Sequence, residues 1–302
     1  MRLGTRRSAL ALTQAEQVAE MLREAGEHVE VVPLATSGDG GAPASDKARW
    51  VDALEDALRE GRIDVAVHSA KDVPGELGTG LALLAAPPRA AVEDALCGAR
   101  GIEDLASGAR VGTSSLRRVA QLRAAREDLD VVALRGNVDT RLQRLHEHHD
   151  GVRAIVLARA GLERLGRGAE ATGALDPERF VPAPGQGTLA LQGRADDGDA
   201  RRAAAAVGDQ QALTCLLAER ALARALGASC HTPLGAWAHA SGEELRLRAW
   251  VGLPDGSEWI ADELRGPAEE PDALGARGAE RLAAVGARDL LARAEEMAVA
   301  GA

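Results

Sequence analysis

One short stretch of this chain contains side chains suited to proton transfer and ion pairing, directly after an apolar segment. Residues 62–74 read RIDVAVHSAKDVP, and their apolar side chains alternate as in a short β-strand. Polar residues follow that strand: His68, Ser69, Lys71 and Asp72. Open α/β sheets bind ligands beyond the carboxyl ends of their strands. We therefore predict that the side-chain carboxylate of Asp72 lies at the mouth of a cleft. The alternative is a surface loop with a solvated Lys–Asp pair.

Arginine and hydroxyl side chains recur where other predicted strands meet predicted helices. A helix start with a Ser or Thr cap attracts anions, and a guanidinium pairs with a carboxylate through two hydrogen bonds. The pattern predicts a site for a substrate with several carboxylates, whereas ordinary helix caps with solvated arginines are the alternative. The residues at these turns are Arg6, Ser8, Thr113, Ser115, Arg117, Arg118, Arg135, Gly136, Arg141 and Arg164.

The three cysteines differ in their surroundings. Cys97 and Cys215 lie in apolar periodic stretches and are predicted to be buried, whereas Cys230 is flanked by small residues and is predicted to be reactive. The odd count without a C-x-x-C pair is typical of a reduced, cytoplasmic protein without a disulfide framework or structural zinc. Residues 147–150 (EHHD) lack a third ligand at a fixed spacing, so we do not predict a metal site.

The order of predicted elements indicates an α/β protein with three parts. Strands and helices alternate up to residue 86, and prolines and glycines at 87–88 and 182–187 bracket an inserted α/β segment. Beyond residue 209 a helix, three strands and a final helix at 271–297 follow. We expect two α/β lobes with a hinged cleft and a small C-terminal α+β domain. The predicted domains are 1–86 with 188–206, 87–187, and 207–302.

Composition narrows the possible partners. The formal net charge of the 302 residues is −10, which argues against non-specific binding to nucleic acid or to an anionic membrane. No stretch approaches the roughly 18 apolar residues of a membrane span. Lys47 and Lys71 are the only lysines in a chain whose other cations are arginines.

Several of these motifs resemble the porphobilinogen deaminase (hydroxymethylbilane synthase) family, in order and across nearly the whole chain. They are RLGTRRSALAL at 2–12, AVHSAKDVP at 66–74, VGTSSLRR at 111–118, LRGNV at 134–138 with Thr140-Arg141, PGQG at 184–187 and Ser229-Cys230.

The resemblance implies a fold, a cofactor and an activity. The first two domains should resemble periplasmic binding proteins, and a dipyrromethane cofactor should be joined by a thioether to Cys230. The activity should be that of a transferase of porphyrin and heme biosynthesis, which joins four porphobilinogen molecules head to tail into hydroxymethylbilane and releases ammonia. The partner should be this small molecule. The protein should be cytoplasmic and monomeric, without a nucleic acid or membrane partner.

The resemblance also assigns residues. Asp72 matches the catalytic aspartate. Cofactor binding is expected of Cys230, Lys71, Ser69, Thr113, Ser115, Arg117, Arg118, Arg135 and Gly136, and substrate binding of Arg6, Ser8, Arg141, Arg164, Lys47 and Trp50.

The chain departs from the family pattern mainly in the segment expected to form the active-site lid. The 37–46 loop is short, Ser37 stands where arginine is usual, and Asp52 stands where lysine is frequent. We expect Trp50 to replace the usual aromatic residue that covers the growing chain. Gln192 and His231 also differ from the pattern.

Two other functions remain open at this point. One is a two-lobed receptor for a polycarboxylate without chemistry, which would need neither Cys230 nor Asp72. The other is a paralogue that folds but does not turn over, suggested by the altered lid.

Overall fold

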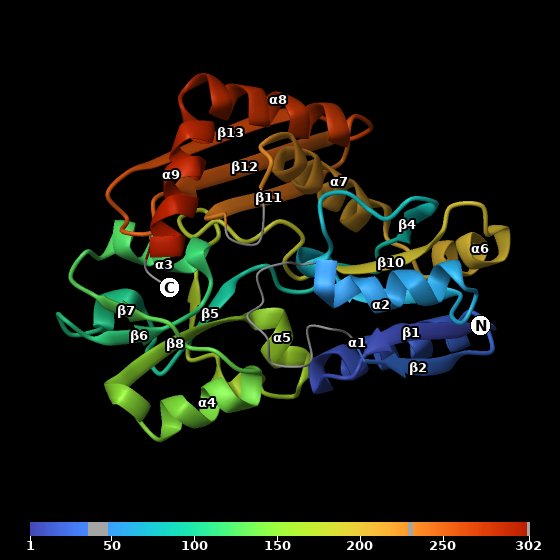
Figure 1. Cartoon of the computed structure of the whole chain (residues 1–302), viewed down its shortest axis with the longest axis horizontal. Coiled ribbons are helices and arrows are strands. Elements are labelled where there is room, and N and C mark those ends of the chain that lie inside the picture. Colours follow the sequence, from blue (N-terminus) through green and yellow to red (C-terminus); the bar gives the residue numbers. More distant parts are fainter. Residues whose placement is uncertain (36–47, 229–231, 301–302) are drawn as a thin grey trace.

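The chain folds into two α/β lobes and a smaller third unit (Figure 1). The computed structural model describes residues 1–35, 48–228 and 232–300. In Figure 1 lobe 1 is mostly blue with a yellow-orange strand and helix, lobe 2 is green, and the third unit in orange and red lies above both. The predicted class, α/β lobes followed by an α+β unit, is confirmed.

Lobe 1 contains a five-stranded mixed sheet in the order β2-β1-β3-β10-β4. Strand β1 pairs in parallel with β2 and β3, whereas β10 runs antiparallel to β3 and β4. Helices α1 (Ala9–Glu24) and α6 (Gly198–Ala206) cover one face, and α2 (Ala48–Arg59) covers the other. The strands are β1 (Arg2–Arg6), β2 (Glu30–Leu34), β3 (Val65–Ser69), β4 (Leu81–Ala85) and β10 (Leu189–Arg194).

Lobe 2 repeats this arrangement with shorter strands in the order β7-β6-β8-β5-β9. Strand β6 is parallel to β7 and β8, and β5 is antiparallel to β8 and β9. The strands are β5 (Asp94–Cys97), β6 (Arg110–Gly112), β7 (Asp130–Val132), β8 (Val152–Ala158) and β9 (Gly173–Leu175). The helices are α3 (Leu116–Ala125), α4 (Val138–His146) and α5 (Arg159–Arg164).

The chain crosses between the lobes twice, and glycines allow the two crossings to run close together. Gly187 has φ +84°, and a Cβ there would lie 2.5 Å from the carbonyl oxygen of Ala90 on the other crossing. Gly185 has φ +76°, and its Cβ would lie 3.0 Å from the backbone nitrogen of Lys71. Any other residue at these positions would be strained and would collide with backbone. The second crossing therefore presses directly on the turn that carries Lys71.

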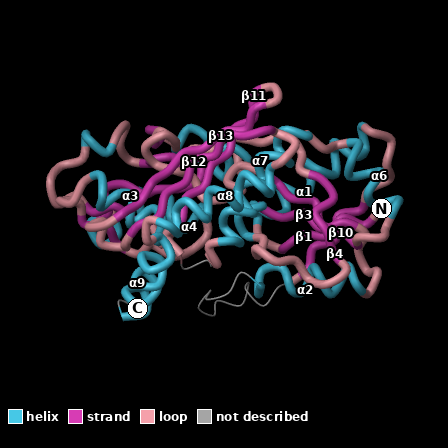
Figure 2. Tube along the Cα trace, turned by 90° about the horizontal axis from the view of Figure 1, so that it is seen from above, coloured by secondary structure: helices cyan, strands magenta, loops and turns pink. Residues whose placement is uncertain are grey.

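The third unit is a three-stranded antiparallel sheet covered by helices. Strands β11 (Leu234–Ser241), β12 (Glu244–Gly252) and β13 (Trp259–Pro267) form a meander. Its core consists largely of Ala and Leu side chains from the sheet and from the helices α7 (Gln210–Ala225), α8 (Pro271–Ala284) and α9 (Ala287–Ala300). In Figure 2 the strands of lobe 1 gather near the N-terminus, and α9 lies toward the opposite end of the molecule.

Two predictions about element boundaries are wrong. The final helix is interrupted after Ala284, because Gly286 adopts φ +94° and α9 starts again at Ala287. His68 and Ser69 lie within β3 and not beyond it, and a single 3-10 turn, η2 (Ala70–Asp72), follows the strand. Strand β9 and helix α6 were not predicted.

Some predictions stay untested. The domain boundaries 1–86 with 188–206, 87–187 and 207–302 stay a prediction, although each sheet lies within one of these segments. Lys47 and Cys230 lie outside the described residues, as do Ser37, His231 and the side chain of Trp50. Within the described part of the chain, no helix is long and apolar enough to cross a membrane.

Candidate functional site

The sheet of lobe 1 brings two groups of predicted site residues to one edge. Strands β1 and β3 are parallel neighbours, so their carboxyl ends meet. Arg6 ends β1, and Ser8 caps α1 by accepting a hydrogen bond from the backbone nitrogen of Ala11 at 3.3 Å. Ser69 ends β3, and Asp72 ends the 3-10 turn that follows. Residues far apart in sequence therefore meet at the start of α1.

A cavity of about 50 Å³ lies at this edge. Four predicted residues line it, Arg6, Ser8, Ser69 and Asp72, together with His68 and others. No described residue donates a hydrogen bond to the carboxylate of Asp72 or pairs with it. Asp72 thus presents its charge to the cavity without an internal partner among the described residues.

Sequence reasoning missed Gln14, which also lines this cavity. Its Nε2 donates to Ser69 Oγ at 2.9 Å, and its side chain is buried. Gln14 lies in the stripe of α1 that otherwise buries Ala15, Val18 and Leu22. A polar residue at an apolar helical position was the available signal.

The parallel strands β6, β7 and β8 form the corresponding edge of lobe 2. Ser115 caps α3 and Asn137 caps α4, so two helix N-termini follow this edge. Thr113 Oγ1 accepts from the backbone nitrogen of Ser115 at 3.3 Å. The predicted cationic side chains Arg135, Arg141 and Arg164 follow β7 and β8, and Gly136 accepts a hydrogen bond from Arg141 Nε at 2.8 Å.

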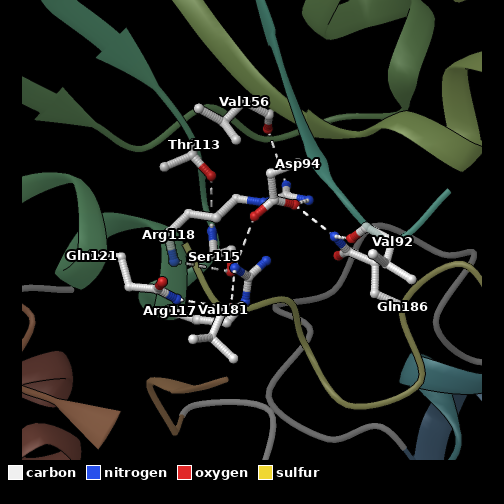
Figure 3. Close-up of polar contacts among 10 residues, drawn as sticks. All are labelled: Val92, Asp94, Thr113, Ser115, Arg117, Arg118, Gln121, Val156, Val181 and Gln186. Carbon is white, nitrogen blue, oxygen red and sulfur yellow. Dashed lines mark hydrogen bonds and ion pairs between the residues drawn. The ribbon is translucent and has the colours of Figure 1, made fainter. Parts of the chain in front are cut away.

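Two adjacent arginines share one buried carboxylate beside this edge (Figure 3). Asp94 Oδ2 accepts from Arg117 Nη1 at 2.8 Å, and Asp94 Oδ1 accepts from Arg118 Nη2 at 2.8 Å. Gln186 Nε2 also donates to Asp94 Oδ1, at 2.8 Å. All four side chains are buried. Although burial opposes ionisation, the charges of both arginines hold the pKa of Asp94 well below its usual range.

The charged groups around Asp94, which we call the cationic cluster, include Arg117, Arg118, Lys71 and Arg141 and carry more positive than negative charge. Burial, with the nearby charge of Arg118, lowers the pKa of Lys71 to about 8 and that of Arg141 to about 10. Burial also lowers the pKa of Arg164. Within the described residues, Asp94 is the carboxylate that hydrogen-bonds to Arg117 and Arg118. Such an excess of buried and half-buried cations favours an anionic ligand.

The third unit supports the turn that carries Asp72. Arg220 on α7 donates to the carbonyl oxygens of Val73 at 3.3 Å, Pro74 at 2.7 Å and Gly75 at 2.9 Å. Sequence reasoning missed this residue. Its charge and its backbone partners lie in different units of the fold, so no local pattern pointed to it.

The two described cysteines are packing residues, as predicted. Cys97 and Cys215 are buried, and burial raises their pKa values to about 12 and about 11. Neither thiol is a reactive group at neutral pH.

These features define a class: a two-lobed α/β protein with a third α+β unit, a largely buried cationic cluster, and in a neighbouring cavity a carboxylate without a partner among the described residues. Comparisons with known proteins specify it further. The family model "Porphobilinogen deaminase, dipyromethane cofactor binding domain" matches residues 1–202, and "Porphobilinogen deaminase, C-terminal domain" matches residues 213–284.

Relatives match along almost their entire length. A porphobilinogen deaminase of Roseiflexus sp. (strain RS-1) is 46% identical over 300 residues, covering 96% of this chain and 98% of the relative. One of Stenotrophomonas maltophilia (strain K279a) is 45% identical over 302 residues, with the same coverage of 96% and 98%. Similar solved structures include the methionine binding protein MetQ, with 14% identity, a TM-score of 0.42, and coverage of 68% of this chain and 89% of that chain.

The chain belongs to the porphobilinogen deaminase family. It is accordingly a transferase of tetrapyrrole biosynthesis that polymerises porphobilinogen, and its matched N-terminal part is a dipyrromethane cofactor binding domain.

Proposed function

We propose that this chain joins four porphobilinogen molecules head to tail into hydroxymethylbilane, with release of ammonia, on a dipyrromethane attached through Cys230. Family membership supports the reaction. The observation that carries the residue assignment is Asp72, whose carboxylate faces a cavity without a described partner. The role of Cys230 rests on its match to the family motif, because it lies outside the described residues.

The described residues fit a cofactor that carries several carboxylates. Arg117 Nε is buried and has no hydrogen-bond partner, and one carboxylate, Asp94, hydrogen-bonds to both Arg117 and Arg118. Lys71 adds a third cation near them. The residues that would hold the cofactor are Ser69, Lys71, Thr113, Ser115, Arg117, Arg118, Arg135 and Gly136. When bound, the cofactor supplies the pyrrole carbon to which the first substrate unit is joined.

Asp72 suits the charge that develops on the substrate. When the carbon–nitrogen bond of the protonated aminomethyl group breaks, the electron pair leaves with ammonia, and an azafulvenium-like cation remains. The carboxylate of Asp72 would accept a hydrogen bond from the pyrrole N–H of this cation and stabilise its charge. Such preorganised electrostatic stabilisation is often the largest single contribution to catalysis.

Substrate recognition falls to the remaining cations. Each porphobilinogen carries an acetate and a propionate, and a growing chain needs a cation for each of them. Arg6, Ser8, Arg141 and Arg164 would bind these groups, with Lys47 and Trp50 in the segment outside the described side chains. With a pKa of about 10, Arg141 keeps its charge at neutral pH although it is half-buried.

The protein is proposed to act in the cytoplasm as a monomer whose partner is porphobilinogen, without a nucleic acid or membrane partner. The net charge of −10 supports the last point, because a like charge repels anionic surfaces.

The direct test is turnover by the purified protein. With porphobilinogen alone, we expect four molecules of ammonia for each hydroxymethylbilane formed. Binding of porphobilinogen without release of ammonia would instead indicate a receptor or an inactive paralogue.

A further inference from the structure

A buried chain of three side chains links α2 to β3 through β10. Gln192 Nε2 donates to Glu55 Oε1 at 2.8 Å, and Gln192 Oε1 lies 2.9 Å from His68 Nε2. Glu55, His68 and Gln192 are all less than one-tenth exposed. These three side chains therefore connect β3, the strand that leads into Asp72, with α2, the helix that follows residues 36–47.

The hydrogen bonds that join Glu55, Gln192 and His68 have a fixed direction. Glu55 also accepts from Arg59 Nη2 at 3.0 Å through Oε2 and from the backbone nitrogen of Gly78 at 3.2 Å through Oε1, so both of its oxygens act as acceptors. The amide of Gln192 must therefore turn its NH2 group toward Glu55. The carbonyl oxygen of Gln192 then faces His68. His68 must donate from Nε2 and carry its proton there.

The same arrangement places a neutral amide, and not a carboxylate, in hydrogen-bond contact with the imidazole ring. The charged groups that act on His68 are Glu55 on α2, Asp72 on the 3-10 turn and Arg6 on β1, whereas its contact on β10 is the neutral Gln192. The amide thus separates the nearest hydrogen-bonded carboxylate from the ring. Burial, the largest cause, lowers the pKa of His68 to about 4, although the hydrogen bond to Gln192 acts in the opposite direction.

We propose that Gln192 is a positioning residue: it fixes the proton of His68 on Nε2, and because it is a neutral amide and not a carboxylate, it lets burial hold the ring uncharged beside Asp72. His68 and Asp72 line the same cavity. A protonated His68 would place a positive charge there and would compete with the substrate cation for the carboxylate. The inference deepens the proposed function, since it rests on the role of Asp72 as the group that stabilises that cation.

A charge-exchange variant tests this proposal. Glu55→Gln/Gln192→Glu keeps the composition, the net charge and the number of hydrogen-bonding groups, but it moves the carboxylate next to His68. The carboxylate introduced at position 192 should raise the pKa of His68. Gln192→Glu alone is a second variant in case the exchange reduces folding.

The first measurement is nuclear magnetic resonance of the full-length holoenzyme labelled with [15N]histidine, with His68 assigned through His68→Gln. In the wild type we expect the Nε2–H tautomer and no titration of His68 between pH 5 and 8. In the exchange variant the titration midpoint should rise by more than one pH unit. An Nδ1–H tautomer, or wild-type titration inside that range, would overturn the proposal whether or not the protein turns over.

The second measurement is the pH profile of kcat. In the exchange variant kcat should fall at least tenfold as the pH is lowered through the new midpoint of His68, with KM little changed, whereas the wild type should show no such step. Adding His68→Gln to the exchange variant should remove the step. A wild-type profile in a variant whose His68 is demonstrably charged would contradict the proposal. Failure of the wild type to form hydroxymethylbilane would instead count against the proposed function alone.

Discussion

At the scale of single residues, the contrast between Asp72 and Asp94 supports the proposed division between a reacting group and a structural one. Asp94 accepts hydrogen bonds from two arginines and a glutamine and is 1% exposed. Asp72 accepts none from a described residue and lines a cavity. A carboxylate that is already neutralised by cations has little capacity to stabilise another charge, so the unpaired one suits the reaction.

Replacing Asp72 tests this assignment. Asp72→Asn keeps the size of the side chain but removes its charge, and a lost electrostatic contact of this kind costs ~3–4 kcal/mol of transition-state stabilisation. We expect kcat to fall by about 100- to 1,000-fold, with an unchanged urea midpoint. Near-normal formation of hydroxymethylbilane by Asp72→Asn would remove Asp72 from its role.

Buried His68 predicts a specific loss of stability in acid. Its folded pKa of about 4 lies below the ordinary value of 6.5, so the unfolded chain binds more protons between these values. The stabilisation is therefore complete above pH 6.5 and is lost as the pH falls toward 4. Between pH 7 and pH 5 the free energy of unfolding should decrease by about 2 kcal/mol from this residue.

Urea unfolding at several pH values measures this contribution. His68→Gln should flatten the curve between pH 7 and pH 5, whereas His146→Gln, at an exposed position, should not. Equal slopes in the wild type and His68→Gln would show that His68 is not buried uncharged.

At the scale of elements, α7 holds the turn that carries Asp72. Arg220→Met keeps much of the side-chain bulk but removes the donors to the carbonyl oxygens of residues 73–75. A displaced carboxylate should lower kcat about 10- to 100-fold, because small misplacements are costly in catalysis. Hydrogen exchange at 70–76 should become faster.

Arg224→Met is the matched control for this experiment. Arg224 lies one turn further along α7, is more exposed, and contacts Glu76 and Asp272 near the surface. It should change neither the exchange nor kcat appreciably. Unaltered exchange in Arg220→Met would mean that the turn holds its conformation without α7.

Local signals in the sequence explain which helices and strands could be predicted. Helix α1 follows local signals in the sequence, because Ser8 caps it and an apolar stripe runs along it. The break at Gly286 was missed, because a single glycine inside a helical pattern is often tolerated and its positive φ is set by packing.

The contacts that organise the site could not be predicted in the same way. His68 and Gln192 are 124 residues apart, and Gln186 and Asp94 are 92 residues apart. No local periodicity encodes such pairs. Motifs identified the edges of the two sheets, but which polar residues are paired inside the fold and which face a cavity depends on tertiary packing.

At the scale of the whole molecule, one buried ion pair joins both crossings to the third unit. Glu219 on α7 accepts from Arg89 Nη1 at 2.7 Å, from the backbone nitrogen of Gly185 at 2.6 Å and from that of Ala238 at 2.7 Å. Glu219 is 0% exposed. Any change in the relative position of the lobes must keep or rearrange these contacts.

Breaking this pair should therefore destabilise the whole fold. Glu219→Gln leaves Arg89 without its buried counter-charge, which typically costs ~3–5 kcal/mol. We expect a clearly lower urea midpoint, partly recovered by Arg89→Met/Glu219→Gln. Glu280→Gln, on the exposed surface of α8, is the control. An unchanged midpoint in Glu219→Gln would show that the junction does not support the fold.

The central claim is that a primer tethered to sulfur occupies the site formed by the cationic cluster and Asp72. Intact-protein mass spectrometry tests it most directly. We predict that the purified protein is heavier than its 31.3 kDa polypeptide by one dipyrromethane, and that Cys230→Ser lacks this addition. A wild-type mass equal to that of the bare polypeptide, in a preparation that turns over porphobilinogen, would contradict the account.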